Sequence, residues 1–274
     1  MSAKTLWGLV VVGALVCTMP GVSWAQSTEQ RVTNLEVMVA DLQARVEALE
    51  AGTGVVACLT TQPGLGVVDD VVFEGCNVHI RNSSGSTTGT PDGTGNLIVG
   101  YNEDETPELD RSGSHNLVIG RRNSYSSYGG LVMGNQNNIT APFASVVGGI
   151  RNTASGEGAT VNGGRTNTAS GLESSVSGGQ LNTASGEFSS VVGGRENIAS
   201  GRHATVAGGV LGTASGPGSV IGGGANNIAS GVQTTVSGGN TNVASSNHST
   251  VSGGRNRTTS GEFDWRGGEF FSED

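Results

Sequence analysis

The apolar and polar positions between Ser145 and Asp264 repeat every fifteen residues, and this repeat is the strongest structural signal in the chain. Its pattern is [ST]-V-x-G-G-x-x-N-x-A-S-G-x-x-x, and eight repeats fill the segment. The apolar position is always β-branched: Val146, Val161, Val176, Val191, Val206, Ile221, Val236 and Val251. A fixed period of this kind predicts an architecture in which each repeat packs on its neighbours along the chain.

The repeat is too short for a helical array and predicts a β-solenoid instead. A pair of helices needs about 30 residues, whereas each repeat here has fifteen residues divided by glycines. Short strands and tight turns fit that length, and stacked coils would lie ~4.8 Å apart. We expect Val to stack on Val inside the coil and Asn on Asn at a turn. Each coil offers little apolar area, so we also expect several rolls to share their apolar faces in an oligomer.

The segment Ser190–Gly201, S-V-V-G-G-R-E-N-I-A-S-G, resembles the head repeats of YadA-type trimeric autotransporter adhesins, whose repeat is slightly shorter. The resemblance covers about half of the chain. It implies an all-β, left-handed parallel β-roll or solenoid with coils of about fifteen residues, assembled as a homotrimer. It also implies an adhesive surface protein, although a fold alone does not fix a function. Nothing after Gly261 resembles the membrane anchor of that family, so we expect attachment by another route.

Residues 1–25 have the features of a secretory signal peptide. Lys4 precedes the apolar stretch Leu6–Val16, and Ser23-Trp24-Ala25 is a small-x-small cleavage site. The apolar stretch is short for a membrane span, and an uncleaved anchor is the alternative. We therefore expect an exported protein that is secreted, held at the cell surface or retained in the periplasm, with no membrane-spanning segment after cleavage.

Residues 26–50 predict a short coiled-coil stalk. Its heptads place Val32, Val39 and Val46 at position a and Leu35, Leu42 and Leu49 at position d. Val at a with Leu at d favours dimers, whereas R-V-E-A-L-E at Arg45–Glu50 resembles a trimer-favouring pattern. We favour the trimer because it agrees with the repeat. A dimer and a single amphipathic helix packed on the roll are the alternatives.

Residues 51–95 predict a β-rich neck. The expected strands are Val55–Leu59, Val67–Phe73 and Asn77–Arg81. Cys58 and Cys76 are the cysteines left after signal removal, and cysteines of exported proteins usually pair. Such a bridge would contribute about 3 kcal/mol. Two free buried thiols are the alternative, and one nearby histidine, His79, is too little for a zinc site.

Residues 96–144 predict irregular coils that precede the regular array at 145–264. Their degenerate repeats are Asn96–Asn102, Asn116–Asn123 and Leu131–Asn137. The insertion Glu103–Ser112 is acidic and is the best candidate for a cation site, although a solvated acidic loop is the simpler interpretation. Residues 265–274, with the aromatic residues clustered from Phe263 onward, predict a cap on the last coil or a tail that binds a partner.

Charge and motifs narrow the function. The net charge is −9, and loss of Lys4 would make it one unit more negative, which argues against nucleic acid and anionic membrane as partners. The repeats up to residue 260 contain no Asp, which calcium-binding β-rolls need, and no catalytic motif occurs. His79, His115, His203 and His248 lie far apart and are expected at the surface.

We therefore predict a non-enzymatic structural or adhesive rod without cofactor or metal. Its expected partners are copies of itself and extracellular matrix, polysaccharide or another envelope protein. A β-solenoid that binds carbohydrate or ice is the alternative, with a solenoid enzyme less favoured. The Ser or Thr before each Val forms a single column, whereas ice binding requires a flat double column.

Overall fold

The computed structural model describes residues 28–51, 59–62, 70–73, 75–103 and 109–268, and the chain divides into two parts at Val78/His79. The first part contains helix α2 (Thr28–Ala51), which covers the predicted stalk. It also contains strands β1 (Leu59–Gln62) and β2 (Asp70–Phe73), paired antiparallel. The predicted strand Asn77–Arg81 is wrong, because this segment has no strand partner and exposes Val78 and Ile80.

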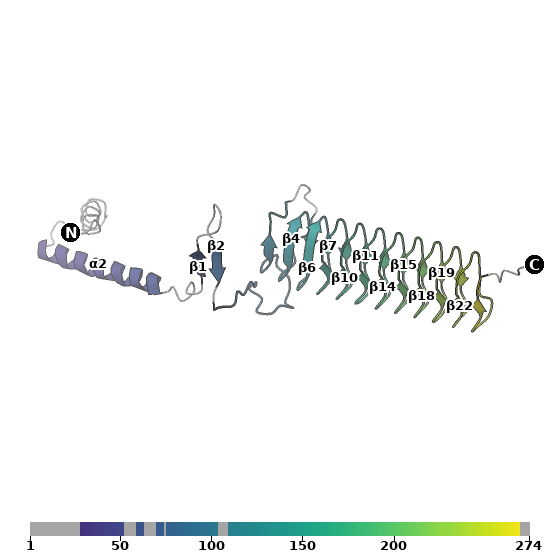
Figure 1. Ribbon diagram of the computed structural model, residues 1–274. Coiled ribbons are helices and arrows are strands. Elements are labelled where there is room, and N and C mark those ends of the chain that lie inside the picture. The colour runs from purple at the N-terminus through teal and green to yellow at the C-terminus, as the bar shows by residue number, and fades with distance from the viewer. Residues whose placement is uncertain (1–27, 52–58, 63–69, 74, 104–108, 269–274) are drawn as a thin grey trace, which may run out of the picture. The chain divides into compact units, whose positions relative to one another are not determined.

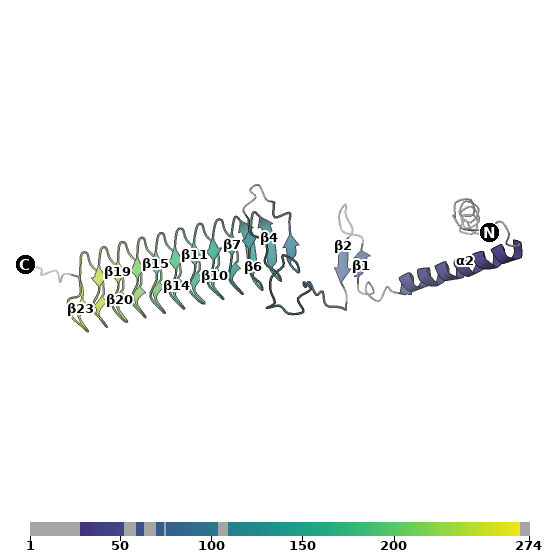
Figure 2. The ribbon, with the colours of Figure 1, turned by 180° about the vertical axis from the view of Figure 1, so that it is seen from behind.

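The second part is a parallel β-solenoid of about 10 turns, drawn in Figures 1 and 2 as a regular stack of coils. One of its two sheets has 12 strands: β3 (Leu97–Val99), β4 (Leu117–Arg121), β6 (Leu131–Asn135), β8 (Ser145–Val146), β10 (Thr160–Val161), β12 (Ser175–Val176), β14 (Ser190–Val191), β16 (Thr205–Val206), β18 (Val220–Ile221), β20 (Thr235–Val236), β22 (Thr250–Val251) and β23 (Trp265–Arg266).

The other sheet has 9 strands: β5 (Ser124–Tyr125), β7 (Asn138–Ile139), β9 (Thr153–Ala154), β11 (Thr168–Ala169), β13 (Thr183–Ala184), β15 (Ile198–Ala199), β17 (Thr213–Ala214), β19 (Ile228–Ala229) and β21 (Val243–Ala244). From β4 to β22 the chain alternates between the two sheets, so that each coil adds one strand to each sheet.

The register keeps like residues on like residues, as predicted. Val161 pairs with Val146 on one side and with Val176 on the other. The irregular coils stack in the same way, since Leu117 pairs with Leu97 and with Leu131. The predicted degenerate repeats are therefore the first coils of the same solenoid.

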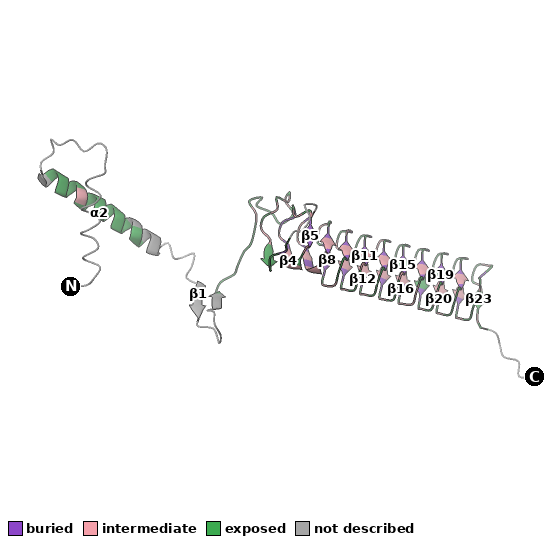
Figure 3. Ribbon diagram, turned by 90° about the horizontal axis from the view of Figure 1, so that it is seen from above, coloured by how far each residue is buried: buried purple, intermediate pink, exposed green. Residues whose placement is uncertain are grey.

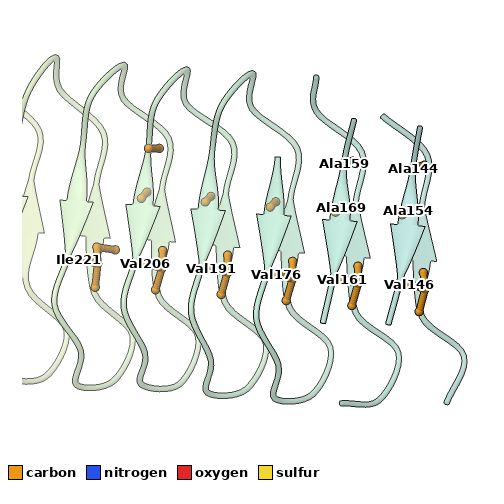
Figure 4. Close-up of a cluster of buried hydrophobic side chains, with 14 of the residues drawn as sticks. Ala144, Val146, Ala154, Ala159, Val161, Ala169, Val176, Val191, Val206 and Ile221 are labelled. Atoms are coloured by element: carbon orange, nitrogen blue, oxygen red, sulfur yellow. The ribbon is translucent and has the colours of Figure 1, made fainter. Parts of the chain in front are cut away.

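The apolar column of Val and Ile residues points into the coil and is completely buried. The eight residues from Val146 to Val251 have 0% exposure, and so does the Ala of each strand in the facing sheet from Ala154 to Ala244. Figure 4 shows these side chains between the two rows of strands, and Figure 3 shows buried positions recurring in every coil. One chain thus closes its own interior, and the expected sharing of apolar faces is not needed to bury the column.

The Asn position forms a hydrogen-bonded ladder, which the sequence also predicted. The backbone N–H of Asn167 donates to Oδ1 of Asn152 (2.9 Å). Its own Nδ2 donates to the carbonyl of Gly163 in the same coil (2.9 Å) and to that of Gly179 in the next coil (3.0 Å). Because both amide hydrogens and the oxygen have partners, this buried polar side chain stabilises the turn.

Glycine is required where neighbouring coils touch through their backbones. A Cβ atom at Gly171 would lie 2.1 Å from the carbonyl oxygen of Gly186. Gly179 combines a similar contact, 2.2 Å to the carbonyl oxygen of Gly194, with φ of +87°. A side chain at either position would push the coils apart, which explains the second Gly of each pair and the Gly of the Ser-Gly step. The first Gly of the pair, such as Gly178, has open space around it, and nothing in the structure requires glycine there.

The Asn ladder is interrupted within the array at Gly212, and Arg257 ends it in the last coil. The Gly212 N–H still donates to Oδ1 of Asn197 (2.8 Å), but it has no side chain to continue the ladder towards Asn227. The nearest aliphatic atom to a Cβ placed there is Cγ2 of Ile221, at 3.5 Å. Ile221 is also the one residue of this column that is not Val, and it borders the place of the missing Asn side chain together with Val206, whose Cγ1 would lie 3.6 Å from that Cβ.

The last described coil carries a charged pair, and the two aromatic residues described beside it are exposed. Arg266 pairs in register with Val251, and its Nε lies 2.9 Å from Oδ2 of Asp264, although the Arg266 side chain is 47% exposed. Phe263 and Trp265 are 72% and 61% exposed, so neither ring covers the coil. The rest of the predicted cap, including Phe270, lies outside the described residues. This charged pair gives the end of the described solenoid a polar surface.

Candidate binding surface

Hydroxyl groups line the outer face of the nine-stranded sheet. In each Thr-Ala-Ser segment the Ala points inward, so that Thr153 and Ser155 flank buried Ala154 on the outside. The Ser residues recur in every coil, whereas Ile198, Ile228 and Val243 interrupt the Thr column. From the sequence only the column of Ser or Thr before Val was predicted, and this second pair of columns was not.

The exposed aliphatic side chains of the solenoid do not form one continuous face. They belong to different positions of the repeat: Val147, Ile150, Leu172, Leu181, Val192, Ile198, Leu211, Val220, Ile228 and Val232. Isolated apolar residues of this kind are normal on a protein surface. The solenoid therefore presents columns of polar and mixed side chains rather than an apolar interface.

A column of nine equivalent turn residues, five of them aromatic, runs along the solenoid, and we call it the ring column. Its members precede the buried small residue of each coil: Phe143, Gly158, Glu173, Phe188, His203, Gly218, Gln233, His248 and Phe263. All have positive φ, from 49° to 66°. Phe188 stacks on His203 with centroids 5.0 Å apart, and His248 stacks on Phe263 at 5.1 Å. Stacked rings at strand spacing stabilise the turn and remain accessible at its edge.

Helix α2 presents an unpaired apolar seam. Val32, Val39, Val46 and Leu42 are 48%, 41%, 50% and 53% exposed. Figure 3 shows this helix as mostly exposed. A heptad seam with that much exposed apolar surface indicates a binding face for another helix.

Carboxylates near the acidic insertion accept hydrogen bonds from their own turns. Asp110 accepts from the backbone N–H and from the hydroxyl of Ser112 (3.0 and 2.6 Å), and these bonds lower the pKa of its carboxyl group. The Thr94 hydroxyl and N–H lower the pKa of Asp92 to about 2 in the same way. Residues 104–108 lie outside the described part, and the described residues contain no group of three or more potential metal ligands.

The histidines and cysteines take separate places. His115 is half-buried, and its Nε2 accepts the Asn82 N–H (3.2 Å), so the expectation of a surface residue is wrong there. His203 and His248 are exposed members of the ring column. Cys76 is disulfide-bonded. Cys58 lies outside the described residues, so the pairing Cys58–Cys76 stays a prediction.

The fold defines this part of the chain as a parallel β-solenoid. No protein-family model matches the sequence, and no curated protein matches it. Within the described residues, no helix has the length and hydropathy of a membrane span.

Proposed function

We propose that this chain is an exported, non-enzymatic surface protein: a trimeric rod with a YadA-like β-roll head that presents a repetitive adhesive surface. The proposal rests on the regular repetition of the outward-facing side chains from coil to coil. Each coil places the same side-chain positions one strand spacing further along the solenoid, through pairs such as Thr160 with Ser175. A surface of this kind binds a repetitive or extended ligand through many weak contacts.

Helix α2 supports the oligomer more directly than the solenoid does. The apolar column inside the coil is completely buried within one chain, whereas Val39 and Leu42 on helix α2 are 41% and 53% exposed. Three heptads of such residues stabilise an association when the seams of neighbouring chains pack together. The trimer is favoured over the dimer by the Arg45–Glu50 pattern and by the resemblance.

Sedimentation equilibrium of the purified chain tests the assembly. We expect three times the monomer mass, and a monomer at micromolar concentration would reject the trimer. Val39→Glu with Leu42→Glu would place charges in the seam and dissociate the oligomer. Ala44→Glu, at an outer heptad position of the same exposed helix, is the matched control and is expected to leave the mass unchanged.

Adhesion is tested by binding of the full chain to immobilised matrix proteins, to polysaccharides and to envelope proteins of the producing cell. We expect saturable binding to one of these classes and weaker binding by the monomeric seam variant, because avidity depends on the number of linked heads. Absence of binding to all three classes would contradict the adhesive function while leaving the oligomer intact.

Export and the disulfide are tested on the same material. Signal cleavage predicts an exported chain that begins at Gln26, and an N-terminus at Met1 would favour the uncleaved anchor. Peptide mapping without reductant is expected to recover a disulfide-linked pair of peptides that contain Cys58 and Cys76. Mapping of any disulfide-linked oligomer shows whether the bridge lies within one chain or between chains.

A solenoid that binds ice or carbohydrate is the second candidate, and the double hydroxyl columns beside Ala154 and its equivalents favour it. Interruption by Ile198, Ile228 and Val243 weakens it, since a flat regular array loses its match at each of these coils. Thermal hysteresis of freezing solutions measures ice binding directly, and a clear effect at micromolar protein would replace the adhesive proposal.

A further inference from the structure

The two turns of each coil carry charges of opposite sign. One turn follows the Gly-Gly pair and leads from the 12-stranded to the 9-stranded sheet, and the other follows the Ser-Gly step and leads back, so the turns form opposite edges of the solenoid (Figure 4). We define the basic edge as the two residues after each Gly-Gly pair, and the acidic edge as the two residues after each Ser-Gly step or its equivalent. In the regular array the basic edge carries four arginines and one carboxylate: Arg151, Arg165, Arg195, Arg255 and Glu196. The acidic edge carries four carboxylates and one arginine: Glu157, Glu173, Glu187, Glu262 and Arg202.

Several of these charges have no partner within their own chain. Arg195 pairs with its neighbour Glu196 (3.3 Å), and Arg202 pairs with Glu187 (3.1 Å). Because the two edges lie on opposite sides of the coil, a charge on one edge does not reach the other edge of the same chain. The edge charges that are exposed and make no ion pair in the described part of the chain are Arg165, Arg255, Glu157, Glu173 and Glu262.

The charges of the two edges lie at matching heights along the solenoid. The coil that carries Arg165 begins at the turn with Glu157 and ends at the turn with Glu173, so the arginine lies between the two carboxylates in height. Since one coil rises by one strand spacing, ~4.8 Å, each of these carboxylates lies within that height of the arginine. The coil that carries Arg255 likewise ends at the turn with Glu262.

The exceptional charge of each edge also lies at the same height as that of the other edge. Glu196 is the carboxylate of the basic edge, and its coil begins at the turn with Glu187 and ends at the turn with Arg202. A second copy placed beside the first without axial offset would therefore bring Arg202 near Glu196 and Glu187 near Arg195. A difference of charge on one edge is matched by a difference on the other.

The uncharged stretches of the two edges coincide as well. The basic edge has no Arg, Lys, Asp or Glu from Val210 to Thr241, and the acidic edge has none from Pro217 to His248. Exposed aliphatic side chains occur on both edges there, with Leu211 and Val232 at 44% and 39% exposure. Charged and uncharged coils thus follow the same order on both edges.

We propose that the basic edge of one copy packs against the acidic edge of the next copy, with the chains parallel and without axial offset. Cyclic symmetry contains no translation along its axis, so equivalent coils of all copies lie at one height and the two edges must match at that height. A contact between two different surfaces is heterologous, and it closes into a ring in a cyclic trimer. Complementary charges of this kind fix the register and exclude wrong pairings. The inference rests on the trimer of the proposed function and adds which surfaces of the solenoid meet.

The test introduces a lysine that reports the contact. Lys4 is the only lysine in the sequence, so Arg165→Lys places the only lysine in the part that follows the expected signal peptide. Carbodiimide treatment of the full chain joins an amine to a carboxylate in direct contact, without a spacer. We expect covalent dimers and trimers on a denaturing gel, and peptide mapping that links position 165 to Glu157 or Glu173 of another copy. Glu157→Gln with Glu173→Gln in the same chain should abolish this product.

Asn240→Lys is the matched control, because it places a lysine at the same repeat position in the uncharged stretch of the basic edge. The adjacent turns of the acidic edge carry Gln233 and Asn247 there, so no carboxylate faces the amine. Arg165→Lys should give at least about tenfold more covalent oligomer than Asn240→Lys, since coupling depends on proximity. Equal coupling of the two variants would overturn the proposed register.

Sedimentation of the same samples separates the two proposals. A trimer in which Arg165→Lys forms no link between chains would refute the contact between the edges and leave the trimer intact. A monomer would refute both. A trimer whose link joins position 165 to Glu157 or Glu173 of another copy supports both.

Discussion

Restoring the missing step of the Asn ladder tests whether the ladder stabilises the solenoid. In an intact step, such as Asn182, the side chain makes two hydrogen bonds through Nδ2 and accepts one through Oδ1. Gly212→Asn would supply the same three bonds, to the carbonyls of Gly208 and Gly224 and from the N–H of Asn227. Gly212 has no positive φ, so its backbone accepts a side chain.

The expected magnitude follows from these contacts. Three buried hydrogen bonds at about 1 kcal/mol net give about 3 kcal/mol, and ordering the Asn side chain costs about 1 kcal/mol. The single change is expected to gain little, because Ile221 borders the space where the coils that keep the Asn have the smaller Val, and overpacking costs about 1–3 kcal/mol. Ile221→Val alone should cost about 1 kcal/mol. The double variant should be about 2 kcal/mol more stable than the parent, a coupling of about 3 kcal/mol.

Urea unfolding of the parent, the two single variants and the double variant gives the double-mutant cycle. Native-state hydrogen exchange of the Asn227 backbone amide gives a local measurement. That amide should exchange more slowly in the double variant, since Oδ1 of the new Asn accepts it. Gly212→Ala with Ile221→Val is the control, because it adds a Cβ without the amide. If the free energy of unfolding of the double variant is no larger than that of this control, the hydrogen bonds of the Asn ladder do not stabilise the solenoid, and the prediction is refuted.

Three further changes probe the interior and the end of the rod. Ser189 has a buried hydroxyl without a hydrogen-bond partner, and the next coil has Ala204 at the same position. Ser189→Ala should therefore raise the free energy of unfolding by about 1 kcal/mol. A lower free energy of unfolding, measured in urea, would contradict this. Val191→Asp buries a charge and should cost more than about 4 kcal/mol, whereas an unchanged melting curve would mean that Val191 faces water. The Ser260 N–H, and next Arg266, hold the pKa of Asp264 below 3.8. The stability from Asp264 is therefore present above 3.8 and lost as pH falls through the lower folded pKa. The Trp265 fluorescence should report fraying of the last coil in that acid range, and Asp264→Asn should remove the transition.

Much of the fold could be predicted from the sequence, because a constant fifteen-residue period places the equivalent residues of successive coils on one another. Val161 over Val146 and Asn167 over Asn152 follow directly from that period. The degenerate coil at Leu117 was also predicted, since a shorter repeat still brings Val118 under Val132. Local pattern failed where no partner strand exists, as at Asn77–Arg81.

The candidate surface was less predictable. The ring column shares the same period, but its residues vary from Gly to Phe, so no single residue type marks it. Of the predicted aromatic cap, Phe263 and Trp265 are exposed and Arg266 pairs with Asp264 beside them, while the rest lies outside the described residues and stays a prediction. Which residue points inward depends on where the last strand pairs, and composition does not contain that information.

The sequence by itself determined the period, the inward Val column, the Asn ladder and the heptad seam, because each depends only on residues at a fixed spacing. The tertiary structure alone decided that one chain closes its own interior, that Gly171 and Gly179 touch the next coil through their backbones, and that the Phe143 ring packs over Gly129 and against Tyr128. These depend on which coil lies against which and on how two turns meet across the interior, and only three-dimensional packing fixes those distances.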